Sequence, residues 1–175
     1  GRGVGRLGVG AILVAGRGTP AAAGVASPDV DADELMASVL GMRRGMLFMT
    51  DHITHVQADA FTNLVARRAR REPLQHITGV AGFRGLELRV GKGVFIPRFE
   101  TELVAGAAID ACRNFPSPIV VDLCAGSGAI ALAIANEVPS AKVLALEVDP
   151  TAIFWLFKNS SRRSASGDTP IQVVQ

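Results

Sequence analysis

The sequence predicts an α/β fold centred on a nucleotide-binding unit, and three observations lead to this prediction. Residues 119–123 form a short apolar run that is typical of a buried strand, and residues 129–136 form a helix rich in small and aliphatic side chains. Between them, Gly126 and Gly128 permit positive φ and a close approach of the backbone to a ligand. A second apolar strand follows at 142–146. Strand, glycine turn, helix and strand in this order predict the first half of a Rossmann-like parallel sheet.

Two acidic residues indicate the class of ligand. Asp122 and Glu147 each stand at the end of one of the two predicted strands. An acid after the second strand of such a sheet accepts hydrogen bonds from ribose hydroxyls. A carboxylate at Asp122 would repel a pyrophosphate but suits an ammonium group, so the order D-x-x-x-G-x-G argues against a dinucleotide. A ligand with an amino-acid end and a nucleoside end fits better, which indicates S-adenosylmethionine. The alternative is an ordinary βαβ unit with a tight turn and no ligand.

Composition excludes several other classes of protein. The 175 residues are 49% apolar, so the chain can bury a core in one or two domains, and a net charge of +2 indicates no particular partner. Cys112 and Cys124 provide no disulfide framework, which favours the cytoplasm, and Cys124 is interpreted as a packing residue of the turn. His52 and His55 lack a third ligand nearby, so no metal site is predicted. No apolar run approaches the roughly 20 residues of a membrane span.

The N-terminal half is predicted to be helical after a poorly defined glycine-rich stretch. One helix is expected over 31–40 with Asp31 as N-cap, and a second over 57–72, closed by Pro73. The last turns of the second helix are basic, which complements the helix dipole. A solvated face is the favoured interpretation of this basic run; a docking patch for an acidic or RNA-bearing partner is the alternative. The run consists of Arg67, Arg68, Arg70 and Arg71.

A β-hairpin and a further helix are predicted between the helical part and the nucleotide-binding unit. Residues 86–90 alternate apolar and charged side chains, and a glycine-rich turn leads into a second short strand at 94–96. Residues 100–113 then form an amphipathic helix. Trp155, beyond the second strand of the unit, is interpreted as a core residue rather than an adenine-stacking one.

Three segments together resemble the HemK/PrmC family, the protein-(glutamine-N5) methyltransferases of peptide chain release factors. They are 71–79 (REPLQHITG), 93–102 (GVFIPRFETE) and 121–133 (VDLCAGSGAIALA), and the resemblance covers about residues 20–175. It implies a truncated class I, Rossmann-like S-adenosylmethionine-dependent methyltransferase domain preceded by a small helical domain and a hairpin linker. The resulting division is a poorly defined stretch at 1–28, a helical substrate-recognition domain at 29–79, a linker at 80–97 and the methyltransferase part at 98–175.

The resemblance implies S-adenosylmethionine as cofactor and peptide chain release factors as protein substrates. A cytoplasmic monomer with no direct contact to nucleic acid or membrane is expected. Asp122 is expected to face the methionine end of the cofactor and Glu147 its ribose. The predicted cofactor-binding residues are Asp122, Cys124, Ala125, Gly126, Ser127, Gly128, Glu147, Arg98, Glu100 and Thr101.

Two departures from the family pattern concern the chemistry. Phe99 stands where the family's I-P-R-P-E-T-E has its second proline, and the 175 residues contain no Asn-Pro-Pro-Tyr, the family's catalytic signature. No catalytic residue is therefore assigned, and the chain is expected to be an N-terminal piece that is inactive alone, with an exposed apolar edge at 119–123. Two alternatives remain: another amino-methyltransferase acting on DNA adenine or another protein, and a non-catalytic truncated product.

Overall fold

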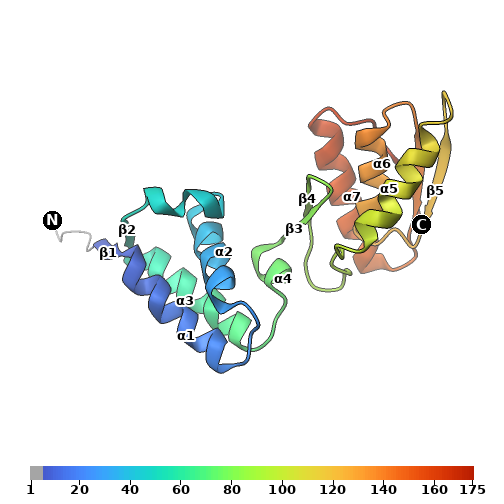
Figure 1. The fold of residues 1–175 in the computed structure, drawn as a ribbon. Coiled ribbons are helices and arrows are strands. Elements are labelled where there is room, and N and C mark those ends of the chain that lie inside the picture. Colours follow the sequence, from blue (N-terminus) through green and yellow to red (C-terminus); the bar gives the residue numbers. More distant parts are fainter. Residues whose placement is uncertain (1–5) are drawn as a thin grey trace. The chain divides into compact units, whose positions relative to one another are not determined.

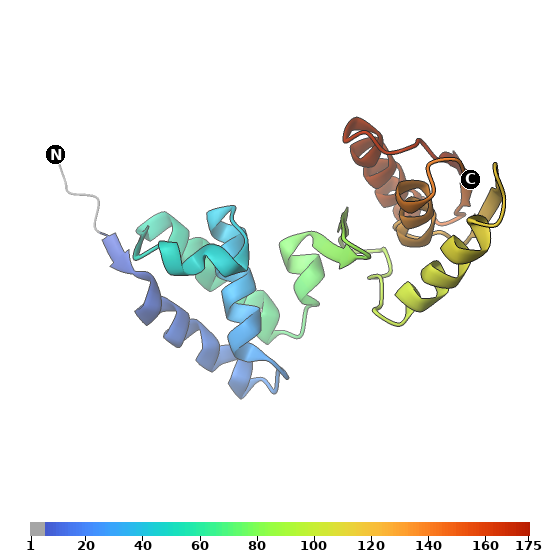
Figure 2. The same ribbon diagram turned by 45° about the horizontal axis from the view of Figure 1, so that its top comes forward.

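The computed structural model describes residues 6–175, and the chain divides after Thr78 into two compact units (Figure 1). In the first unit, three helices pack against one another around a cluster of buried apolar side chains. Figure 2 shows the same ribbon from a second direction. Its elements are β1 (Arg6–Gly8), α1 (Val9–Ala22), α2 (Pro28–Leu40), the 3-10 helix η1 (Arg44–Met49), β2 (His52–Thr54), α3 (His55–Ala69) and α4 (Leu74–Thr78).

Local sequence explains where the helices of the first unit begin. Thr54 caps α3 through a capping box, in which the Gln57 N–H donates to Thr54 Oγ1 at 3.2 Å and the Thr54 N–H donates to Gln57 Oε1 at 2.9 Å. The helix α2 begins at Pro28, three residues before the predicted cap Asp31, because proline suits the first position of a helix. Asp31 is instead buried inside α2.

The glycine-rich stretch differs from its prediction. Residues 9–22 form the helix α1, although several glycines and Pro20 give them low helix propensity. Tertiary packing overrides that propensity: Gly16 is buried against Phe61 of α3, and a Cβ at Gly16 would overlap the Phe61 ring. The glycine is therefore a close-contact position rather than a sign of disorder. Residues 1–5 of the predicted stretch lie outside the described residues.

The basic run at the end of α3 is mostly used inside the first unit. Arg68 donates from Nε to Asp31 Oδ2 at 2.6 Å and from Nη1 to the Glu72 carbonyl at 2.8 Å. Arg67 pairs with the Glu72 carboxylate, and Arg71 donates to two carbonyls of the turn between α1 and α2. Arg70 and Arg71 are exposed, as a solvated face predicts, whereas Arg68 is partly buried against Asp31.

The second unit begins with a hairpin that differs from the predicted one. The strand β3 (Val80–Phe83) pairs antiparallel with β4 (Leu86–Arg89), whereas residues 94–96 form no strand. The two strands are joined by Arg84 and Gly85, whose φ values of 44° and 77° match a two-residue hairpin turn. That tight turn pairs β4 with the preceding segment and not with the following one.

A three-stranded parallel sheet forms the rest of the second unit, in the order β5-β6-β7. Its strands are β5 (Ile119–Leu123), β6 (Lys142–Leu146) and β7 (Gln172–Val174), and its helices are α5 (Thr101–Cys112), α6 (Ala129–Glu137) and α7 (Pro150–Ala165). The parallel sheet with its crossover helices confirms the predicted α/β, Rossmann-like class.

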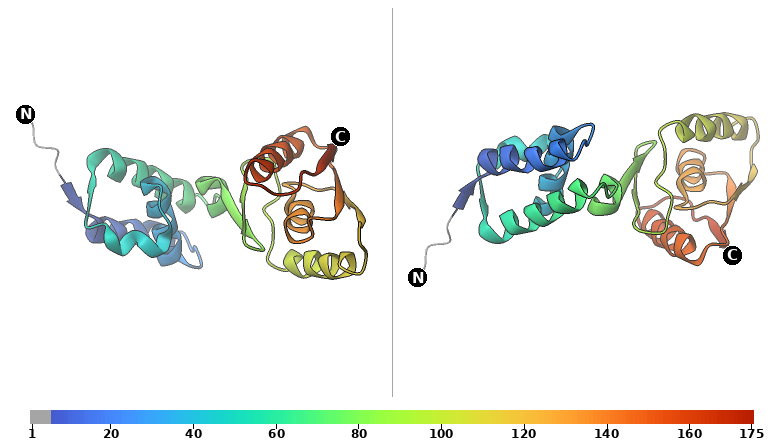
Figure 3. Two further views of the ribbon diagram at one scale, coloured as in Figure 1. Left: turned by 90° about the horizontal axis from the view of Figure 1, so that it is seen from above. Right: turned by 90° about the horizontal axis from the view of Figure 1, so that it is seen from below.

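All three helices lie on one side of the sheet (Figure 3). Val143 and Ala145 of β6 face them and are buried, whereas Leu144 and Leu146 on the opposite side of the strand are less so. The strand β5 lies at the edge of the sheet, and its side chains at 119, 121 and 123 are exposed. The expected apolar edge is therefore present.

Candidate functional site

The carboxyl ends of β5 and β6 bring the glycine turn and both predicted acids together. Asp122 pairs in register with Ala145, one residue pair before the ends of both strands. The Gly126 N–H donates to Glu147 Oε2 at 2.8 Å, and the Ala131 N–H donates to Asp122 Oδ2 at 3.1 Å. The two carboxylates thus hold the turn and the start of α6 from either side, at the sheet edge where open α/β proteins bind ligands.

Glycine serves a different physical purpose at each of the two glycine positions of the turn. Both lie at positive φ, 57° at Gly126 and 85° at Gly128. A Cβ at Gly126 would meet no atom within 4 Å, whereas one at Gly128 would come within 2.6 Å of Leu156 Cδ1. Gly128 is therefore required by packing against α7, and Gly126 borders open space through which a ligand can approach the backbone.

The remaining turn residues provide backbone rather than side-chain chemistry. The Ala125 N–H donates to the Leu146 carbonyl at 2.9 Å, and the Ala125 carbonyl accepts from the Gly128 N–H at 2.8 Å. Ser127 is buried, and Cys124 is an exposed free thiol at a φ of 60°. These bonds attach the turn to the end of β6.

Glu147 has a structural role that sequence reasoning missed. Its side chain is only 8% exposed, and its carboxylate accepts three backbone N–H groups, from Asp149, Gly126 and Val148. The bond from Asp149 contributes most to holding the pKa of Glu147 below its ordinary value, against an opposing effect of burial. Oε1 accepts two of these bonds and Oε2 one, so Oε2 retains acceptor capacity for a ligand hydroxyl.

Asp122 has the opposite electrostatic character. Burial raises its pKa above the ordinary value; the hydrogen bond from Ala131 partly offsets this, and the negative charge of Glu147 adds to it. Among residues 6–175, hydrogen bonding reaches only Oδ2 of this carboxylate. Within the described part of the chain, Asp122 has no cationic partner, and a half-buried carboxylate of this kind is a suitable site for an ammonium group.

The predicted loop residues Arg98, Glu100 and Thr101 are not joined to the turn. Arg98 and Glu100 are exposed, and the Arg98 guanidinium lies 5.0 Å from the ring centroid of Phe95. Thr101 begins α5 and donates its N–H to the Arg98 carbonyl at 3.1 Å. In the part of the chain that the structure describes, no hydrogen bond or ion pair connects these three residues with the glycine turn.

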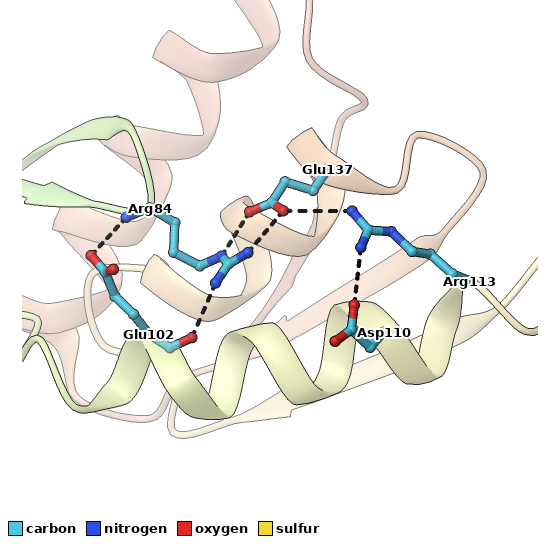
Figure 4. A network of polar contacts seen from close by, with 5 residues as sticks. All are labelled: Arg84, Glu102, Asp110, Arg113 and Glu137. Carbon is cyan, nitrogen blue, oxygen red and sulfur yellow. Dashed lines mark hydrogen bonds and ion pairs between the residues drawn. The ribbon is translucent and has the colours of Figure 1, made fainter.

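A polar network fixes the hairpin turn to two helices (Figure 4). Arg84 donates to the Glu137 carboxylate of α6 at 2.7 and 2.9 Å, and from Nη1 to the Glu102 carbonyl of α5 at 3.2 Å. Its backbone N–H donates to Glu102 Oε1 at 2.9 Å. Glu137 also pairs with Arg113, which in turn pairs with Asp110. The Arg84 hydrogen bond keeps the pKa of Glu137 below its ordinary value.

A second side chain that sequence reasoning missed is Asn159 of α7, which is buried and hydrogen-bonded to both the hairpin and the glycine turn. The sequence feature that could have indicated this buried role is a single amide side chain on the apolar helix face that also carries Ala152 and Leu156.

Trp155, on the same helix, packs against Ala81 and its apolar neighbours, which agrees with its interpretation as a core residue.

Residues 6–175 contain neither a candidate metal site nor a candidate membrane span. No three histidine, cysteine, aspartate or glutamate side chains in this part of the chain are grouped to hold a metal ion. None of its helices is both long enough and apolar enough to cross a membrane.

Comparisons with known proteins agree on one family. Residues 12–79 match the family of the PrmC N-terminal domain. The chain is 54% identical over 140 residues to a release factor glutamine methyltransferase of Streptomyces coelicolor, covering 78% of this chain and 49% of the relative. It is 46% identical to one of Mycolicibacterium smegmatis, covering 87% and 54%, and 37% identical to one of Geobacter sulfurreducens, covering 85% and 52%. The chain thus spans about half the length of these curated relatives.

Solved structures show weaker similarity. A putative transferase of Pyrococcus horikoshii, PH0793, shares 22% identity at a TM-score of 0.45, over 55% of this chain and 35% of that one. The P. horikoshii TYW2 structure in complex with MeSAdo has the same identity and TM-score, over 55% and 34%.

Proposed function

We propose, from the premise that this chain belongs to the release factor glutamine methyltransferase family, that it is part of an enzyme methylating the side-chain amide nitrogen of a glutamine. The methyl donor is S-adenosylmethionine, and the glutamine is that of the Gly-Gly-Gln motif in peptide chain release factors. The observation that carries the proposal is the glycine turn held between Asp122 and Glu147, in a chain 54% identical over most of its length to such an enzyme.

The residues around the turn fit this cofactor. Asp122 offers an ionisable carboxylate oxygen for the ammonium of the methionine end, and Glu147 Oε2 offers an acceptor for a ribose hydroxyl. The open space beside Gly126 lets the ligand lie against the backbone. When bound, S-adenosylmethionine supplies an electrophilic methyl group. Arg98, Glu100 and Thr101 are proposed to border the same cofactor from the loop before α5.

The methyl acceptor requires groups beyond the cofactor side of the site. An amide nitrogen is a weak nucleophile because its lone pair is delocalised into the carbonyl, so the enzyme must hold the NH2 group and aim it at the methyl carbon. The 175 residues contain no Asn-Pro-Pro-Tyr to do this, and we assign the chain cofactor binding and substrate recognition only.

The remaining assignments follow from the family. Residues 29–79 are proposed to recognise the release factor, residues 80–97 to link the two parts, and residues 98–175 to begin the methyltransferase domain. The enzyme is proposed to act as a monomer in the cytoplasm, without direct nucleic-acid contact. The internal pairing of Arg67, Arg68 and Arg71 argues against the basic run as the docking surface.

Calorimetry with two ligands tests the cofactor assignment residue by residue. Asp122→Asn is expected to weaken S-adenosylmethionine binding but to leave adenosine binding unchanged, because adenosine has no ammonium group. Glu147→Ala is expected to weaken both, by about 1.5–3 kcal/mol, since both carry the ribose. Binding of neither ligand by the wild-type chain, or equal binding of NAD, contradicts the proposal. Equal effects of Asp122→Asn on both ligands would refute its placement at the methionine end.

A further inference from the structure

Asn159 is a buried polar side chain of the second unit whose amide is hydrogen-bonded through both its oxygen and its nitrogen. It lies in α7 with 1% of its surface exposed. Its Oδ1 accepts the Arg89 N–H at 2.6 Å, and its Nδ2 donates to the Arg89 carbonyl and to the Ser127 carbonyl, both at 2.9 Å. Both amide hydrogens are therefore used, each on a different element of the fold.

The two groups that Asn159 joins are otherwise distant in sequence. Arg89 ends β4 of the hairpin, and the amide of Asn159 bonds its N–H and carbonyl as a neighbouring strand would. Ser127 is the middle residue of the glycine turn and is itself buried. One turn earlier on α7, Leu156 lies against Gly128. One face of α7 thus supports the turn at two adjacent residues.

We propose that Asn159 is a positioning residue that ties the cofactor-binding turn to the hairpin, so that ordering of either one stabilises the other. The proposal rests on the function assigned above, which places the cofactor at this turn. Asn159 touches no ligand in this scheme; it acts through the Ser127 carbonyl. Its loss leaves the buried Ser127 carbonyl and both part-buried backbone groups of Arg89 without their partner, so the turn relaxes.

The test compares variants of equal stability. Asn159→Leu keeps the approximate volume and removes all three hydrogen bonds; Asn159→Ser is a smaller second variant in case the first does not fold. The control is Ile109→Val or Ile109→Ala, whichever matches in stability, because Ile109 is fully buried in the core of the same unit and lies in α5. Stability is followed by fluorescence of Trp155, the single tryptophan of the chain.

The expected result is at least tenfold weaker binding of S-adenosylhomocysteine by the Asn159 variant than by its stability-matched Ile109 control. Equal affinities of the two would overturn the positioning role while leaving the cofactor assignment intact. No binding by the wild-type chain would overturn the proposed function and this inference together.

A second measurement uses only the wild-type chain. Hydrogen exchange is followed by mass spectrometry on peptides covering β4 and the glycine turn, with and without S-adenosylhomocysteine. Coupling through Asn159 predicts that the ligand slows exchange severalfold at both the turn and the Arg89 amide, whose N–H donates to Asn159. Protection of the turn with unchanged exchange at Arg89 would show that the two elements are independent, and would overturn the proposal.

Discussion

Substituting alanine at each glycine of the turn separates packing from ligand access. At Gly128, with a φ of 85°, an alanine adopts the left-handed region, which costs about 1–2 kcal/mol. Its Cβ also comes within 2.6 Å of Leu156 Cδ1 and 3.2 Å of Leu132 Cδ1, and overpacking of this kind costs about 1–3 kcal/mol. Because both leucines are buried, neither can move aside freely. We expect Gly128→Ala to lower the free energy of unfolding by about 2–5 kcal/mol.

Gly126→Ala is the matched control, since its φ of 57° is also left-handed but its Cβ meets no atom within 4 Å. It is expected to lose only the backbone contribution of about 1–2 kcal/mol. Replacing glycine by alanine also reduces the entropy of the unfolded chain, which offsets about 0.4–1 kcal/mol of the stability loss. This contribution is the same in both variants and therefore cancels when they are compared. The effects on cofactor binding are expected in the opposite order. Gly126→Ala places a methyl group where the cofactor approaches, so it is expected to weaken S-adenosylmethionine binding more than its loss of stability explains.

Urea unfolding followed by Trp155 fluorescence measures this difference, because the single tryptophan lies in the second unit and reports on that unit alone. Isothermal titration calorimetry measures the affinities. Equal stability losses in the two variants would show that Leu156 yields without cost and would refute the packing argument. Wild-type affinity in Gly126→Ala would refute the placement of the cofactor beside that residue.

Four further predictions concern charge and activity. Because burial raises the pKa of Asp122, its ionisation destabilises the fold as pH rises, so Asp122→Asn should raise the thermal midpoint at pH 7. Wild-type affinity for S-adenosylmethionine should fall as pH is lowered through this raised pKa, and a parallel fall in Asp122→Asn would contradict the assignment. Arg68→Ala should destabilise the first unit by about 3 kcal/mol, measured by circular dichroism, because it leaves the buried Asp31 unpaired. The unfolding of the second unit, followed by Trp155 fluorescence, should stay unchanged in this variant. The control variant Arg70→Ala should have a stability near that of the wild type. Residues 1–175 incubated with a release factor and methyl-labelled cofactor should transfer no label to the Gly-Gly-Gln glutamine; label above background would mean that unidentified residues hold that glutamine.

Local patterns in the sequence predicted several elements of the second unit and the glycine turn between β5 and α6. The predicted strands at 119–123 and 142–146 have the bounds of β5 and β6, and the predicted helix at 100–113 differs by one residue at each end from α5. Apolar periodicity and a glycine turn act over a few residues, so the chain alone carries this information. The adjacency of Asp122 and Glu147 followed as well, because parallel strands place their carboxyl ends at one edge.

Tertiary structure decided what individual side chains do. The hairpin partner of β4 depended on the turn at 84–85. The glycine-rich stretch forms the helix α1, in which Gly16 allows close packing against Phe61. The bonds of Glu147 to the turn, and those of Asn159 to Ser127, join residues that no local pattern connects. Buried polar groups must find partners wherever the folded chain brings them, so their roles depend on distances that only the assembled fold defines.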